Sequence, residues 1–294
     1  MLRFIFGKPM TGKTYTVIQK IKELCQSKKE AVLIVPEQAS FEAEKNILKE
    51  LGDSSALYVE CASFTRLYDM IGKKIGGIAG TVLKDSHKIV FMNKAIKSVA
   101  DDLKLWGKYK NSIRFSKTVL DTVGEMKINS VTPEMLRETA EELKPSTLRD
   151  KLLDLALIYE TYDLLLGEKF IDPADILTKV YENLKNYEFF KGKTVFIDSF
   201  KGFTGQQYKI IERILCQAED VYISITNDPE NCEEYSVFSN IRKAVLKIQD
   251  IAKGRGVNVA EPIILTENYY KNIGVSSAQL VVAGEKPMET NCEN

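Results

Sequence analysis

The run of residues 7–14, Gly-Lys-Pro-Met-Thr-Gly-Lys-Thr, constrains this chain more than any other feature of its sequence. It matches G-x-x-x-x-G-K-[ST], a loop whose backbone N–H groups surround a phosphate chain at the start of a helix. Apolar residues alternate in residues 2–6, as in a strand, and recur at helical spacing in residues 17–24. This strand–loop–helix context predicts a phosphate-binding loop. The competing interpretation is a chance glycine turn before a helix.

Each position of this loop has an expected part in nucleotide binding. The two glycines allow the backbone to bend, and the helix N-terminus adds its partial positive charge. We expect the lysine to reach the β- and γ-phosphates and the following threonine hydroxyl to coordinate magnesium. The predicted cofactor is Mg–ATP. The predicted nucleotide-binding residues are Gly7, Lys8, Pro9, Met10, Thr11, Gly12, Lys13 and Thr14.

A magnesium ion at such a loop also needs a carboxylate at the end of a neighbouring strand. The buried-strand pattern at 194–197 ends in Asp198, which we expect to hold magnesium together with Thr14. An ordinary strand end is the alternative, because aspartate is common there. Many nucleotide-hydrolysing motors have a glutamate at the next position, whereas this chain has Ser199. A hydroxyl lacks carboxylate basicity, so we predict nucleotide binding with little or no turnover, and we assign no catalytic residue.

Composition limits the class of protein. The 294 residues are 44% hydrophobic, which suffices for one large core or two domains. The 41 basic and 41 acidic side chains cancel, so total charge neither favours nor excludes a nucleic-acid partner. Five scattered cysteines without a C-x-x-C pair fit a reducing compartment, and the single His87 argues against histidine-based metal or triad chemistry. We expect a cytoplasmic chain with no signal peptide and no membrane span.

Strand-like and helical patterns alternate in the first 65 residues and return after residue 190, which predicts an α/β fold. Continuous apolar runs such as 31–35, bounded by charged residues and proline, are typical of strands buried on both faces of a parallel sheet. The predicted strands are 2–6, 31–35, 57–59, 194–197, 221–225 and 263–265.

Residues between these two blocks show helical spacing, and Asp172-Pro173 is a helix-start signal. We therefore assign 85–190 to an inserted helical subdomain. Residues 1–84 and 191–270 are assigned to one P-loop α/β domain, and 271–294 to a tail with little pattern.

Three further segments follow predicted strands. They are Val-Pro-Glu-Gln-Ala-Ser-Phe at 35–41 with Glu44, Ser-Phe-Thr-Arg-Leu at 63–67, and Ile-Asp-Ser-Phe-Lys-Gly-Phe-Thr at 197–204. Together with the phosphate loop, these segments resemble the N-terminal region of AddB, the second subunit of the bacterial AddAB helicase–nuclease, which processes double-strand DNA breaks. The resemblance spans about residues 1–230, and the segments at 35–41 and 63–67 are its most specific parts.

This resemblance implies a RecA-like, superfamily-1 helicase-like domain with a helical subdomain inserted before the strand that ends in Asp198. It also implies a subunit that is not the DNA-driving motor, binds single- and double-stranded DNA, and works with an AddA-type helicase–nuclease subunit in homologous recombination. The family's nuclease domain and its iron–sulfur cluster, held by four cysteines, lie beyond residue 294 in a much longer chain. We therefore expect an N-terminal fragment, and no cysteine here is assigned to that cluster.

Two groups of residues are candidates for DNA contact. Residues 84–118 are rich in lysine and arginine with interleaved aromatics, which suits single-strand binding, and Lys104, Lys108 and Lys110 are the candidates there. The favoured alternative is a solvated helix face whose aromatics point into the core. Thr65 and Arg66 follow the third predicted strand, where a hydroxyl and a guanidinium suit phosphate contacts. The alternative for this pair is a helix cap with a surface ion pair.

Two other classes of function remain open. A small-molecule or nucleotide kinase would use the same loop, but it needs basic groups that converge on the transferred phosphoryl group. The arginines of this chain are dispersed and form no recognisable lid. A nucleotide-free scaffold that binds a partner motor subunit is the second alternative, and nucleotide affinity separates it from the leading interpretation.

Overall fold

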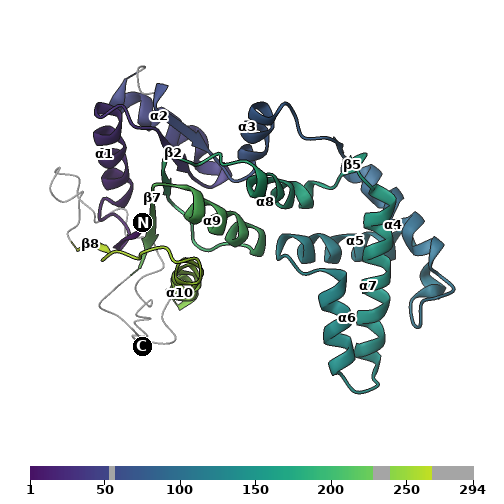
Figure 1. Ribbon diagram of the computed structural model, residues 1–294. Coiled ribbons are helices and arrows are strands. Elements are labelled where there is room, and N and C mark those ends of the chain that lie inside the picture. Colours follow the sequence, from purple (N-terminus) through teal and green to yellow (C-terminus); the bar gives the residue numbers. More distant parts are fainter. Residues whose placement is uncertain (53–56, 228–238, 267–294) are drawn as a thin grey trace, which may run out of the picture.

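The computed structural model describes residues 1–52, 57–227 and 239–266. Figure 1 shows an α/β unit with a block of helices that projects from it. The tail assigned to 271–294 lies outside the described residues, as do Cys232 and Cys292.

The central sheet has six strands in the order β3-β2-β6-β7-β1-β8, and all neighbours pair in parallel. The predicted α/β class with a parallel sheet is therefore confirmed. Strands are β1 (Leu2–Gly7), β2 (Ala31–Ile34), β3 (Val59–Ala62), β6 (Thr194–Ile197), β7 (Asp220–Thr226) and β8 (Ile263–Leu265).

The third strand lies later than predicted. It begins at Val59, where the expected run of 57–59 ends, and Leu57 is 78% exposed. Pairing with β2 decides this, because Val59 and Ala62 are the buried positions that lie opposite Ala31 and Ile34. The second half of β3, Cys61 and Ala62, has small side chains, and these do not form the apolar run that predicts a buried strand.

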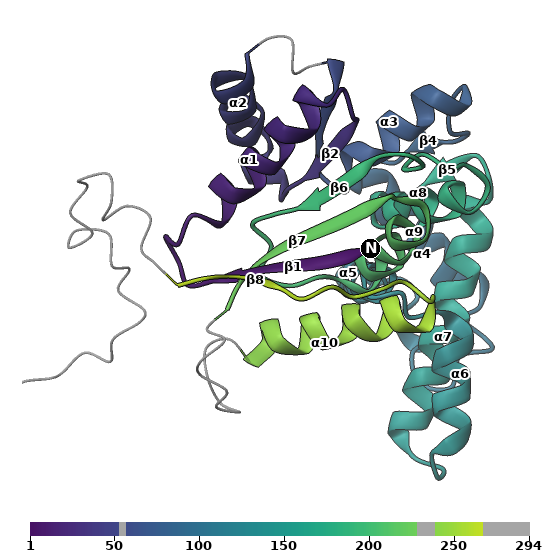
Figure 2. The ribbon, with the colours of Figure 1, turned by 60° about the vertical axis from the view of Figure 1, so that its left-hand side comes forward.

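Helices cover both faces of the sheet (Figure 2). Strand alternation sends Ile5, Leu33 and Phe196 to the face under α1 and α2, and it sends Phe4, Ile34 and Ile197 to the other face. The 3-10 turn η1 (Glu37–Ala39) precedes α2. Helices of the first face are α1 (Lys13–Gln26) and α2 (Ser40–Leu51), and those of the second are α3 (Arg66–Ile75), α8 (Ile176–Asn186), α9 (Gly205–Gln217) and α10 (Ser239–Gly254).

The segment between β3 and β6 contains the inserted helices, which have a hydrophobic core of their own around Met92, Ile96 and Tyr162. A short parallel pair of strands, β4 and β5, lies at the base of this block and was not predicted. The elements are β4 (Thr81–Val82), α4 (Asp85–Ser98), η3 (Gly107–Tyr109), α5 (Ile113–Ile128), α6 (Pro133–Glu142), α7 (Thr147–Leu166), β5 (Phe170–Ile171) and η4 (Pro173–Asp175).

The helical insertion is confirmed, whereas its limits at 85 and 190 stay a prediction. Helix α8 falls inside that range, but its buried Val180 and Leu184 belong to the core under the sheet. Asp172 caps the turn before α8 as predicted, because its carboxylate accepts a hydrogen bond from the backbone N–H of Ala174 at 3.0 Å.

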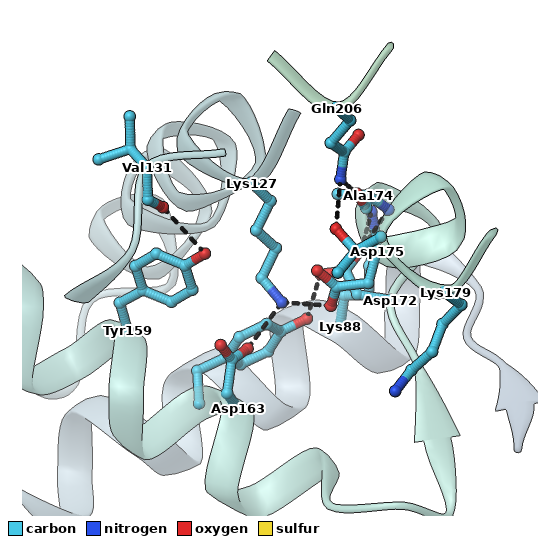
Figure 3. Close-up of polar contacts among 12 residues, drawn as sticks. Lys88, Lys127, Val131, Tyr159, Asp163, Asp172, Ala174, Asp175, Lys179 and Gln206 are labelled. Carbon is cyan, nitrogen blue, oxygen red and sulfur yellow. Dashed lines mark hydrogen bonds and ion pairs between the residues drawn. The ribbon is translucent and has the colours of Figure 1, made fainter. Parts of the chain in front are cut away.

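A buried lysine connects the insertion to the segment that returns to the sheet (Figure 3). Lys127 of α5 donates to Asp163 of α7 at 2.6 Å and to Asp175 of η4, and its side chain is 1% exposed. The rings of Tyr159 and Tyr162 lie 5.6 and 5.4 Å from the ammonium. Burial alone would lower the pKa of Lys127, but Asp175 and Asp163 outweigh it and raise that pKa above its ordinary value.

Further contacts complete this junction. The Tyr162 hydroxyl donates to buried Asp172 at 2.8 Å. Gln206, at the start of α9, donates to the Ala174 carbonyl at 2.6 Å and to the Thr178 hydroxyl at 2.9 Å. A Cβ atom on Gly205 would lie 2.2 Å from the carbonyl oxygen of Asn129, so glycine permits the end of α5 to approach α9. The orientation of the insertion thus depends on buried polar contacts.

We predict that Lys127→Met destabilises the chain by about 1–3 kcal/mol, because it leaves the partly exposed Asp163 and Asp175 without the buried cation that they share. Urea unfolding at neutral pH measures the free energy. The combined change Lys127→Met, Asp163→Asn, Asp175→Asn is the control and should recover most of the loss. A single variant as stable as the parent chain would contradict the role assigned to Lys127.

Candidate functional site

The residues of the predicted phosphate loop form a tight turn between β1 and α1 at the carboxyl edge of the sheet. Gly12 has a φ of 84° and Met10 a φ of 65°, so both lie in the left-handed region. A Cβ atom on Gly7 would lie 2.2 Å from the Thr11 hydroxyl oxygen, which itself donates to the Lys8 carbonyl at 2.9 Å. The turn therefore requires glycine at 7 and favours it at 12.

The start of α1 is suited to an anion. Gly12 has no side chain that could cap the helix, and the first turn contains no acidic residue. Backbone N–H groups at a helix start carry partial positive charge and attract phosphate. The Lys13 ammonium lies against the loop, where it donates to the carbonyls of Gly7 at 2.9 Å and Lys8 at 2.6 Å. The Lys13 ammonium and the N-terminus of α1 therefore lie in the same turn, where both can attract a phosphate group.

Asp198 directly follows β6 at the same edge of the sheet and is 3% exposed. The Thr14 hydroxyl donates to Asp198 Oδ2 at 2.9 Å, across 184 residues of sequence. The structure therefore places the two predicted magnesium ligands in direct contact. A carboxylate and a hydroxyl are hard oxygen ligands of the kind that magnesium prefers, and magnesium sites commonly use few protein ligands together with phosphate and water.

Two serines hold the same carboxylate. Ser199 donates to Asp198 Oδ2 at 3.1 Å, and Ser224 of β7 donates to Oδ1. Ser199 has a φ of 67°, so the backbone turns sharply after Asp198. The residue after the aspartate therefore supplies a second hydroxyl contact to it and contributes no carboxylate.

A cavity of about 290 Å³ adjoins this corner. Thr14, Asp198 and Ser199 line one part of it, and Glu42 and Asn46 of α2 line another. Polar groups on several sides make the cavity able to hold water or ions next to the carboxylate. Sequence reasoning did not identify Glu42 or Asn46, since neither belongs to a recognisable pattern.

Ser224 and Asn227 were also missed. Ser224 is a buried polar residue in the apolar run of β7, an exception that can be seen in the sequence once the strand is assigned. Asn227 follows the same strand, and its N–H donates to the Gly7 carbonyl at 3.2 Å. Its buried Oδ1 has no hydrogen-bond partner within the part of the chain that the structure describes. An acceptor without a partner thus lies beside the loop.

The lysines proposed for DNA contact lie on the helical insertion. Lys104 pairs with Asp150 at 2.9 Å, and Lys110 pairs with Asp101 at 3.7 Å. Lys108 lies 5.1 Å from the ring centroid of Tyr109. A role of Lys104, Lys108 and Lys110 in DNA binding stays a prediction.

Two of the three aromatics interleaved with these lysines face inward, whereas Tyr109 is 43% exposed. Trp106 and Phe115 pack against the core of the insertion and meet edge to face, with centroids 5.5 Å apart. Buried Asp154 accepts hydrogen bonds from the backbone N–H groups of residues 104–106, which holds the loop in place. This arrangement favours the alternative of a solvated face with aromatics in the core.

Thr65 and Arg66 lie at the start of α3 and are exposed. Arg66 forms an ion pair with Glu44, and its N–H is capped by the Ser63 hydroxyl at 3.1 Å. Thr65 lines a cavity of about 550 Å³ between the sheet unit and α5. These contacts fit a cap with a surface ion pair, and a phosphate-contacting role for this pair stays a prediction.

No helix within residues 1–52, 57–227 and 239–266 is long and apolar enough to cross a membrane.

Comparison with known proteins adds a family to this geometry. The family model described as "ADDB, N-terminal" matches residues 4–275. The B subunit of an ATP-dependent helicase/deoxyribonuclease from Thermoanaerobacter sp. (strain X514) is 33% identical over 274 residues, which cover 92% of this chain and 24% of the relative. The protein of the same name from Clostridium acetobutylicum is 34% identical over 270 residues, or 90% of this chain and 23% of the relative.

The chain spans about a quarter of the length of these curated relatives. The matched residues include the loop at 7–14, the strand that ends in Asp198 and the whole helical insertion. The family model covers far more than half of the chain, so the chain belongs to the AddB family and corresponds to its N-terminal region.

Proposed function

We propose that this chain is the nucleotide-binding, non-motor, helicase-like region of an AddB-type subunit. The contact between Thr14 and Asp198 carries the proposal, because it joins the phosphate loop to a buried carboxylate at one edge of the sheet. Mg–ATP is the proposed ligand. In an open parallel sheet, ligands bind outside the carboxyl ends of the strands, which is where both groups lie.

The loop residues have separate roles in this proposal. Backbone N–H groups of residues 7–14 and the start of α1 bind the phosphate chain. Lys13 neutralises the terminal phosphates, for which its ammonium must leave the carbonyls of Gly7 and Lys8. Thr14 and Asp198 hold magnesium, which neutralises phosphate charge when it is bound.

Little or no nucleotide turnover is proposed. Hydrolysis needs a base or a water-orienting group near the terminal phosphate. Ser199 occupies the position after Asp198, and its hydroxyl is hydrogen-bonded to that aspartate. We infer that nucleotide serves as a structural or regulatory ligand of this region.

The wider context is also a proposal, because the chain covers only a quarter of its relatives. We propose that the region acts with an AddA-type subunit on single- and double-stranded DNA, in cytoplasmic repair of double-strand breaks by homologous recombination. The names of the relatives, which describe the B subunit of an ATP-dependent helicase/deoxyribonuclease, support this assignment.

A kinase is less well supported. Phosphoryl transfer needs basic groups that converge on the phosphate. Arg213 of α9 packs on the ring of Tyr181, and Arg255 pairs with Glu212, so both lie over the helices beneath the sheet.

We predict that Lys13→Ala lowers affinity for Mg–ATP at least tenfold, because it removes the cation of the loop; isothermal titration calorimetry measures this. Lys22→Ala on the same helix is the matched control and should bind as the parent does. An unchanged affinity in Lys13→Ala would refute the nucleotide site. If the unmodified chain binds no nucleotide, the alternative of a nucleotide-free scaffold is favoured. If the chain hydrolyses ATP when DNA is added, and this hydrolysis depends on Lys13, the non-motor assignment is refuted.

A second prediction concerns Ser224, which holds one oxygen of Asp198. Ser224→Ala removes that donor from a buried carboxylate, so we expect a stability loss of about 1–3 kcal/mol. We also expect several-fold weaker ATP binding with magnesium and little change without it. Urea unfolding and calorimetry with and without the ion measure these effects. Ser116→Ala, at a buried serine of the insertion, is the control; an equal loss of magnesium-dependent binding in both variants would contradict a local role.

A further inference from the structure

Charge is distributed unevenly over this neutral chain. The helices α8, α9 and α10, which lie together under the sheet, contain eight lysines and arginines against three carboxylates. Helices α1 and α2 on the other face contain five against four. The basic residues of the first set are Lys179, Lys185, Lys209, Arg213, Arg242, Lys243, Lys247 and Lys253, and the acidic ones are Glu182, Glu212 and Asp250.

Several of these basic side chains lie near the rings of two tyrosines where the helices pack together. Tyr181 of α8 has three cations around its ring: Lys185 at 4.6 Å, Arg213 at 5.4 Å and Lys209 at 5.9 Å from the centroid. Lys209 and Arg213 come from α9, so the cluster spans two helices. At the next seam, Lys247 of α10 lies 4.1 Å from the centroid of Tyr208 of α9. Lys185, Lys209, Arg213 and Lys247 are called the basic face below.

Two of the three carboxylates on these helices form ion pairs with cations outside the basic face. Glu212 pairs with Arg255, and Glu182 pairs with Lys179. Among the described residues, no cation of the basic face forms an ion pair with a carboxylate. Lys185, Lys209 and Lys247 are exposed. The charged ends of these side chains lie near the tyrosine rings, and this contact restricts their motion before a ligand binds.

The rings themselves are not free for a ligand. Tyr181 and Tyr208 are partly buried and already in contact with cations. Single-strand binding usually relies on aromatic rings that stack with bases, whereas contacts to a duplex backbone use cations and hydrogen-bond donors and need no stacking ring. A duplex also has the denser charge, about one phosphate per 1.7 Å of axis. Preplaced cations without an exposed ring therefore fit a duplex better than a single strand.

We propose that the basic face binds the phosphate backbone of double-stranded DNA without reading its sequence. This rests on the proposed function for the choice of DNA as the polyanion. The surface is distinct from the phosphate loop, which lies at the carboxyl edge of the sheet. It is also distinct from Lys104, Lys108 and Lys110 on the insertion.

The test removes four charges from the basic face with Lys185→Gln, Lys209→Gln, Arg213→Gln and Lys247→Gln in one variant. Fluorescence anisotropy with a short labelled duplex measures affinity over a range of salt concentrations. We expect at least tenfold weaker binding at low salt. We also expect the slope of log K against log salt to become shallower by up to about 3.6, since each of the four lost phosphate contacts contributes roughly 0.9 to it.

The matched control is Lys22→Gln, Lys28→Gln, Lys45→Gln and Lys49→Gln, which removes the same charge from α1, its C-terminal end and α2. It should change duplex binding less than twofold. A second control variant keeps every charge of the basic face and should retain duplex binding. It combines Lys185→Arg, Lys209→Arg, Arg213→Lys and Lys247→Arg. If the first variant does not fold, Lys185→Gln with Lys209→Gln alone must still weaken binding.

Three outcomes would overturn the proposal. One is unchanged duplex binding in the Gln variant of the basic face. A second is an equal loss in the α1–α2 control, which would indicate net charge alone. The third is a larger loss for a single-stranded oligonucleotide than for the duplex. Calorimetry with Mg–ATP separates this test from the proposed function, because the basic-face variant should bind nucleotide as the parent does.

Discussion

The parallel register of β6, β7 and β1 is the constraint on which the rest of the structure depends. Parallel pairing aligns the carboxyl ends of all six strands at one edge of the sheet, so Gly7 at the end of β1 and Asp198 just after β6 lie at the same edge, with β7 between their strands. In this register Ser224 lies opposite Ile5, from where its hydroxyl reaches Asp198. A slip of one residue would turn Ser224 to the other face of the sheet and leave the buried carboxylate without that donor.

The helical insertion uses a different kind of attachment. Its own apolar core stabilises it internally, but its position relative to the sheet is set by polar groups, chiefly Lys127 with Asp163 and Asp175. Buried ion pairs contribute modestly to net stability and are costly to break, so they determine geometry more than they add free energy. Residues of this junction line two cavities of about 570 and 550 Å³, so its packing is incomplete.

Charge and aromatic residues are arranged differently in space than in sequence. The stretch at 84–118 looks like a nucleic-acid contact because cations and rings alternate there, yet Trp106 and Phe115 pack inward and Lys104 is paired. A second group of cations comes from three helices that are separated by strands and loops in the chain, and cations of two of them surround Tyr181. Helix packing places Lys185, Arg213 and Lys247 on one side of the sheet, while the whole chain stays neutral.

Several features could be predicted from the sequence because they depend only on residues close together in the chain. Residues 7–14, the buried-strand run that ends in Asp198 and the cap at Asp172 are each contained in a short segment, because backbone geometry and strand or helix periodicity act over a few residues. The start of β3 was misplaced, since pairing with β2 and not the apolar pattern decided it. Only the tertiary structure decided that Thr14 contacts Asp198, that Ser224 supports it, that Lys127 is buried between two carboxylates, and that four cations gather beneath the sheet. Those contacts join residues tens to hundreds of positions apart, and strand order and helix packing, which no short segment encodes, bring them together.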